Sequence, residues 1–138
     1  MSVSKHELGE ASDAEVRDLV ARTLVGESAQ AAGLLVALPY AEGFGGQLLV
    51  FGAGEDPGEP VRGRWVHVGY RGYADSADSP LPTLKPGELI ALHDVADAQP
   101  EAVFLLTAED LKRMSGGAAV MLEEWRATRE RWRACVLA

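Results

Sequence analysis

The sequence predicts a single α+β domain with an N-terminal helix, a sheet of about five mainly antiparallel strands, and two C-terminal helices packed on one face of the sheet. Three observations predict this class. Apolar residues near the N-terminus repeat with a helical period, short apolar runs bounded by glycine and proline occupy residues 33–106, and helix-start signals return after residue 107. A chain of 138 residues can bury one core but has no room for a second full domain.

The first helix is predicted from a start signal and an apolar stripe. Residues 12–15 read Ser-Asp-Ala-Glu, the spacing of a capping box. We expect the helix to end near Gly26, with residues 1–10 as a flexible N-terminus and residues 11–138 as the domain. A stripe with i, i+3, i+4 spacing is predicted to face the core, and it contains Val16, Leu19, Val20, Thr23 and Leu24.

The strands are predicted from five apolar runs, at residues 33–38, 48–51, 64–71, 89–92 and 102–106. The first two runs could form a hairpin. The third run alternates, which places Val66, Val68 and Tyr70 on one face of the sheet. The opposite face then receives Trp65, His67, Gly69 and Arg71.

Two C-terminal helices are predicted after the last run. Thr107 is a cap for a short helix, which Ser115-Gly116-Gly117 would end. A final helix is expected from about Ala118. Its apolar stripe would contain Met121, Leu122, Trp125, Trp132 and Val136, with Arg129 within it.

Several chemical classes are disfavoured by composition. The lone cysteine, Cys135, excludes a disulfide framework and a Cys-rich zinc module, and its place beside the final stripe favours a buried, inert thiol. No apolar run approaches the ~20 residues of a membrane span, and residues 1–7 lack a signal peptide's apolar stretch, so a cytoplasmic location is expected. No metal, cofactor or catalytic residue is predicted.

Charge is distributed unevenly. The chain carries 21 acidic and 13 basic side chains, a net charge of −8. Residues 1–111 account for −11 and residues 112–138 for +3. Such an acidic surface repels phosphate backbones and attracts basic surfaces, which disfavours generic nucleic-acid binding and favours a basic protein partner.

The most informative stretch is residues 62–73, where arginines and aromatics gather with no acid among them. Aromatics beside arginines suit stacking, acidic ligands or a protein interface, although a structural role for both is the open alternative. His93 and Asp94, near a strand end, could converge with His67 as a base and its orienting carboxylate. The candidate ligand- or partner-binding residues are Arg64, Trp65, His67, Tyr70, Arg71, Tyr73, His93, Asp94 and Arg129.

One family resemblance can be stated. The order of a helix, three strands and a later strand running into Leu105-Leu106-Thr107 is loosely similar to small members of the PD-(D/E)xK nuclease superfold. The corresponding strands would be residues 47–51 and 65–70, where His67-Val68-Gly69 stands in place of the metal-binding acid and lysine. The resemblance therefore implies an inactive relative at most, and no nuclease site is assigned.

These observations lead to two functional hypotheses. The first is a non-enzymatic, acidic, cytoplasmic protein-binding domain, such as an immunity protein, antitoxin or adaptor, that recognises a basic partner. The alternative is a small-molecule-binding domain or enzyme with a pocket near Trp65, His67, Arg71 and His93. A homodimer through the tryptophans of the C-terminal helix is a further hypothesis.

Overall fold

A computed structural model describes residues 13–38, 47–54, 56–74, 78–99, 101–115 and 122–138 of the chain. The elements are α2 (Asp13–Ala31), β1 (Leu35–Ala37), β2 (Gln47–Ala53), β3 (Val61–Arg71), β4 (Leu89–Asp94), β5 (Val103–Leu106), α3 (Ala108–Ser115), the 3-10 turn η1 (Glu123–Trp125) and α4 (Arg129–Leu137). The expected flexible segment 1–10, the capping serine at position 12 and the expected helix start at position 118 lie outside the described residues.

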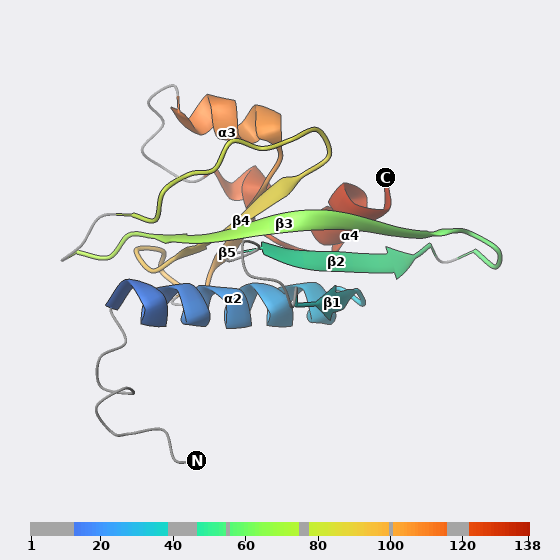
Figure 1. Ribbon diagram of the computed structural model, residues 1–138, viewed down its shortest axis with the longest axis horizontal. Helices are drawn as coiled ribbons and strands as arrows, with labels where there is room; N and C mark the ends of the chain where they lie inside the picture. The colour runs from blue at the N-terminus through green and yellow to red at the C-terminus, as the bar shows by residue number, and fades with distance from the viewer. Residues whose placement is uncertain (1–12, 39–46, 55, 75–77, 100, 116–121) are drawn as a thin grey trace, which may run out of the picture.

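The strands form one sheet in the order β1-β2-β3-β4-β5 (Figure 1). All neighbouring pairs are antiparallel except β3 and β4, which are parallel. The predicted α+β class and the predicted hairpin of the first two strands are confirmed. The predicted alternation along β3 is also confirmed, because Val66, Val68 and Tyr70 are buried together in the main core.

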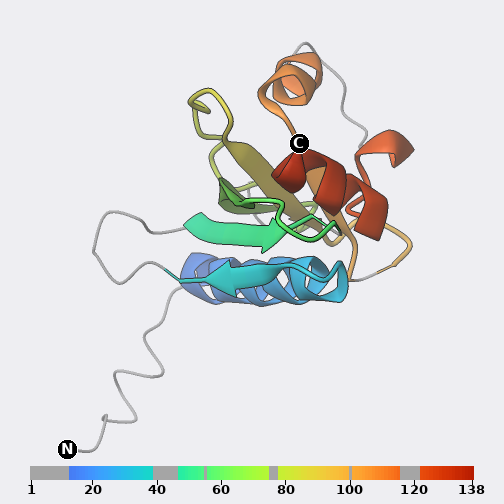
Figure 2. The ribbon, with the colours of Figure 1, turned by 90° about the vertical axis from the view of Figure 1, so that its right-hand side faces the viewer.

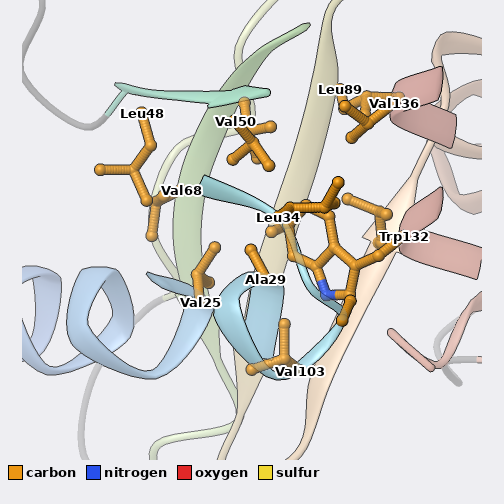
Figure 3. Packing of buried hydrophobic residues seen from close by; sticks show 14 of the residues in the cluster. Val25, Ala29, Leu34, Leu48, Val50, Val68, Leu89, Val103, Trp132 and Val136 are labelled. Carbon is orange, nitrogen blue, oxygen red and sulfur yellow. The ribbon is translucent and has the colours of Figure 1, made fainter. Parts of the chain in front are cut away.

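Two hydrophobic clusters cover the two faces of the sheet. The larger cluster packs α2 and α4 against one face, and Trp132 of α4 lies beside Val25 and Ala29 of α2 (Figure 3). The smaller cluster packs Leu111 of α3 and Trp125 of η1 against the other face. The two C-terminal helices therefore do not share a face, contrary to the sequence-based expectation. The reason is that every residue of β4 and β5 is buried, so both faces of these strands need a cover.

The orientation and length of α2 differ from the prediction. Its buried residues are Ala21, Val25 and Ala29, whereas most of the expected stripe is exposed. The helix also continues past Gly26 to residue 31. Two residues after its end stands Gly33, whose φ of 82° lies in the left-handed region that glycine adopts readily. There the Gly33 amide donates to the Gln30 carbonyl at 2.9 Å.

The predicted long tryptophan stripe is divided between two elements. Trp125 belongs to η1, and a new helix begins at Arg129 after Thr128, whose hydroxyl accepts a hydrogen bond from the Arg131 amide. Trp125 and Trp132 are 1% and 0% exposed and belong to different clusters. The tryptophans behind the homodimer hypothesis are thus core residues of the monomer.

The two edges of the sheet differ. At β5, the Ala127 amide donates to the Val103 carbonyl at 2.9 Å, and Arg131 Nε donates to the Leu105 carbonyl at 2.7 Å. At β1, the part of the chain that the structure describes contributes no further strand on the outer side. Figure 2 shows β1 lying alongside α2 at this edge. Within the described residues, no helix has both the length and the apolarity to cross a membrane.

Candidate binding surface

The aromatic and arginine residues predicted on β3 are divided between the two faces of the sheet. The register pairs His67 with Ile90 and Tyr70 with His93. Ile90 belongs to the cluster under α3, whereas Tyr70 belongs to the cluster under α2. Because side chains alternate along a strand, His67 and His93 lie on opposite faces. The pocket that the sequence placed among Trp65, His67, Arg71 and His93 is therefore not formed by these four residues together.

His67 belongs to a local polar cluster. Gln47, directly opposite on β2, places its Nε2 2.9 Å from His67 Nε2. Glu88 Oε1 lies 3.3 Å from the same ring nitrogen. The pKa of Glu88 is lowered, chiefly because its carboxylate accepts a hydrogen bond from the Lys85 amide, with burial opposing and His67 adding a smaller contribution. Cross-strand pairing with Gln47 and the close contact with the Glu88 carboxylate account for the position of this histidine.

Arg71 and Asp94 meet where the parallel strands β3 and β4 end. They are register partners, and Arg71 Nε lies 3.8 Å from Asp94 Oδ2. Asp94 is 7% exposed, and its Oδ1 accepts a hydrogen bond from the Ala96 amide at 3.0 Å. A cavity of about 230 Å³ adjoins Arg71, between Ser79 and Met114. This is the part of the predicted site that could hold a small ligand.

On the opposite face of the sheet, which α2 covers, Tyr70 and Tyr73 belong to the hydrophobic core. Tyr70 is buried, and its ring meets that of Tyr73 edge-to-face with 5.6 Å between centroids. Arg17 of α2 lies over the Tyr73 ring at 4.2 Å. His93 is 3% exposed on this face. These residues join α2 to the sheet and present little surface to a partner.

The remaining candidates lie near the C-terminus. Arg64 donates from Nη2 to the Ala138 backbone oxygen at 2.7 Å, which ties β3 to the end of α4. Arg129 is exposed in the first turn of α4, and the continuous stripe in which the sequence placed it is not formed, because Trp125 belongs to η1. Burial raises the pKa of the Cys135 thiol, in keeping with its interpretation as an unreactive side chain. Among the described residues, no three His, Cys, Asp or Glu side chains gather as metal ligands.

Sequence reasoning missed an apolar surface on α2. Val16, Leu19 and Val20 are 49%, 62% and 41% exposed. Among the described residues, the exposed large apolar side chains also include Leu35 in β1 and Leu38 just after it. We call Val16, Leu19, Val20 and Thr23 the α2 strip. The spacing of these residues is visible in the sequence, but it predicts a buried stripe, because the apolar stripe of an amphipathic helix usually faces the core.

A groove runs beside this strip, between α2 and β1. Its volume is about 340 Å³, and Leu19 and Thr23 join it to the strip. The other lining residues are Arg22, Gly26, Glu27, Gln30, Val36, Leu38 and Leu48. Beyond the backbone of its own helix, no heavy atom of the described residues lies within 4 Å of the place that a Cβ atom of residue 26 would occupy. The groove thus combines apolar side chains with polar ones, it is open at Gly26, and Glu27 contributes a carboxylate to its lining.

No family model, curated protein or solved structure matches this chain. The interpretation of function therefore depends on the geometry and charge of these two places, the groove beside α2 and the cavity beside Arg71.

Proposed function

We propose that the chain is a non-enzymatic, cytoplasmic protein-binding domain that uses the α2 strip and its groove to recognise a partner with a basic surface. An immunity protein, an antitoxin and an adaptor are functions of this kind. The observation that carries the proposal is the exposure of Val16, Leu19 and Val20 along one side of a helix. Contiguous exposed apolar surface of this kind marks interaction sites in soluble proteins.

The charge of the chain supports a basic partner. The net charge is −8, and Glu27 stands at the rim of the groove. Arg22 also lines the groove, but Asp18 pairs with it at 2.8 Å, so the Glu27 carboxylate remains to attract a partner whose apolar patch is bordered by lysine or arginine. Electrostatic attraction would then raise the association rate and make it depend on salt.

The small-molecule alternative has fewer residues to support it than the sequence suggested. Of its four residues, only Arg71 lines the cavity beside the ends of β3 and β4. His93 lies on the other face with Tyr70. The groove beside α2 is larger than the cavity beside Arg71, and it adjoins the exposed α2 strip. It therefore supports a binding function better.

Affinity purification of the tagged full chain from its native cell extract, at low and high salt, tests the proposal. Leu19→Gln removes an exposed apolar side chain from the groove without changing the charge, and Leu81→Gln makes the same change beside the Arg71 cavity. We expect a stoichiometric basic protein to be retained by the wild type and by Leu81→Gln at low salt. High salt and Leu19→Gln should each release it.

Either of two results would contradict this function. One is that no protein is retained in stoichiometric amount. The other is retention that depends on Leu81 and not on Leu19, which would move the binding site to the Arg71 cavity.

A further inference from the structure

The α2 strip has the spacing that one helix presents to another. Val16, Leu19, Val20 and Thr23 follow one another at i, i+3, i+4 and i+7, so they form a single line along the outer side of α2. The buried residues Ala21, Val25 and Ala29 occupy the opposite side. A partner helix can interdigitate with such a line and lie in the groove beside it.

Gly26 supports close approach by a partner. Glycine in a helix interior weakens the helix relative to alanine, so its presence calls for a reason. No described residue crowds its Cβ position, so packing within the fold does not require glycine there. Since Gly26 lines the groove, the missing side chain leaves room for the side chains or backbone of a docked helix.

Charge decides which helix fits. Arg17 is engaged over Tyr73, and Arg22 Nη2 pairs with Asp18 Oδ2 at 2.8 Å. Arg17 is thus directed toward Tyr73, and Asp18 and Arg22 offset each other, so the exposed Asp13 and Glu27 make the outward side of α2 acidic. A second copy of this chain would bring a charge of −8 against −8, whereas a lysine-rich helix would be attracted.

A partner strand added at the β1 edge, beside which the described residues place no further strand, is a weaker alternative. β1 has only 3 residues, so an added strand would gain few backbone hydrogen bonds. The α2 strip would also remain exposed in that arrangement. A helix along α2 covers both the strip and the groove.

We infer that the partner contributes a basic amphipathic α-helix, which packs lengthwise on the α2 strip and approaches α2 most closely at Gly26. This inference rests on the proposed function and specifies the recognised element.

A synthetic peptide tests it directly. The probe is a helical peptide of leucine, alanine and lysine, with leucine at i, i+3, i+4 and i+7 and lysine on the other side. Its affinity for the full chain is measured by fluorescence anisotropy, and its helix content by circular dichroism. A scrambled peptide of the same composition keeps the charge but loses the apolar face. We expect the amphipathic peptide to gain helicity on binding and to bind at least about tenfold more tightly than the scrambled one.

Gly26→Leu is the decisive variant, because it fills the groove without changing charge. Leucine is the better helix former, so the midpoint of thermal unfolding should not fall, and lost binding cannot be blamed on lost structure. We expect affinity for the amphipathic peptide to fall at least about tenfold. Ala14→Leu adds the same side chain at an exposed position on the side of α2 away from the strip, and it should leave affinity unchanged.

Three results would overturn the inference. Equal binding of the scrambled peptide would mean charge attraction alone. Unchanged affinity in Gly26→Leu would place the peptide elsewhere. Sedimentation of the wild type as a dimer that Gly26→Leu dissociates would make a second copy the occupant.

A photo-crosslinking amino acid in place of Thr23, used in the native extract, separates this inference from the proposed function. A crosslink to a helical, lysine-rich segment of the retained protein supports both. A crosslink to an extended segment leaves the protein-binding function standing and overturns the helix. A crosslink to residues 1–12 of the same chain makes that segment the occupant and overturns the inference. Retention of no protein contradicts the proposed function, whatever the peptide does.

Discussion

A surface helix is expected to bury its larger apolar side chains, but α2 exposes them and buries mostly small ones. The side against the sheet and α4 uses Val25 and the two small residues Ala21 and Ala29, whereas the solvent side carries the larger Leu19 together with Val20. Small side chains let the helix lie close to the sheet and to Trp132, which fills the space beside it (Figure 3). Close packing, rather than the largest apolar side chain, decided which side faces inward. The larger residues then remain available for a partner.

The largest expected effect tests the buried side. Trp132→Ala removes a side chain that is 0% exposed and whose Nε1 donates to Ser28 Oγ at 2.8 Å. We expect the free energy of unfolding to fall by about 3–5 kcal/mol, measured by urea denaturation. A loss below about 1 kcal/mol would mean that this side of α2 is not held by the core.

The β5 edge of the sheet can be compared with the β1 edge. Later parts of the chain hydrogen-bond to β5, whereas the described residues place no further strand beside β1. Asp110 Oδ2 accepts hydrogen bonds from the Thr107 amide at 3.0 Å and from Arg131 Nη2 at 2.8 Å, which joins α3 to α4. Asp110→Asn should lower the free energy of unfolding by about 2 kcal/mol at neutral pH. Glu109→Gln, an exposed neighbour in the same turn, should leave it nearly unchanged.

This contribution also has a defined pH dependence. Burial alone would raise the pKa of Asp110, but hydrogen bonds from Thr107 and Arg131 outweigh it and lower the pKa below its ordinary 3.8. A lowered folded-state pKa stabilises the fold above the unfolded value, and this stability is lost as the pH falls through the folded value. The difference between wild type and Asp110→Asn should therefore be constant near neutrality and shrink below about pH 4. A difference that grows on acidification would contradict the assigned hydrogen bonds.

Much of the fold followed from local signals, but the candidate site did not. Alternation along β3 predicted the correct faces for Val66 and His67, because one residue of register decides a whole strand. For α2 the sequence does not determine which side is buried, since Ala21, Val25 and Ala29 form a second apolar line opposite Leu19. Which line faces inward depends on how closely the helix approaches the sheet and on Trp132, which lies 104 positions beyond Ser28. Local periodicity carries no information about either.

A smaller change in the free energy of unfolding is expected when the two hydroxyls of α2, Ser28 and Thr23, are removed in turn. Ser28→Ala leaves the buried Trp132 Nε1 without its acceptor, and the free energy of unfolding should fall by about 1–2 kcal/mol. The Thr23 hydroxyl donates to the Leu19 carbonyl of its own helix at 2.9 Å, so Thr23→Ala should change the free energy of unfolding by less than about 0.5 kcal/mol. Equal losses in the two variants would remove the distinction between the two sides of the helix.

The smallest expected effect on folding belongs to the open side. Leu19 is 62% exposed, so Leu19→Gln should change the free energy of unfolding by less than about 0.5 kcal/mol. The same substitution should lower the fluorescence of a dye that binds exposed apolar surface, because it removes the side chain that joins the α2 strip to the groove. Leu81→Gln, at a less exposed leucine beside the other cavity, is the control and should lower the dye signal less. A loss of about 2 kcal/mol or more in Leu19→Gln would show that this leucine serves folding. The outer side of α2 would then be part of the core, and the basis for a docked partner would disappear.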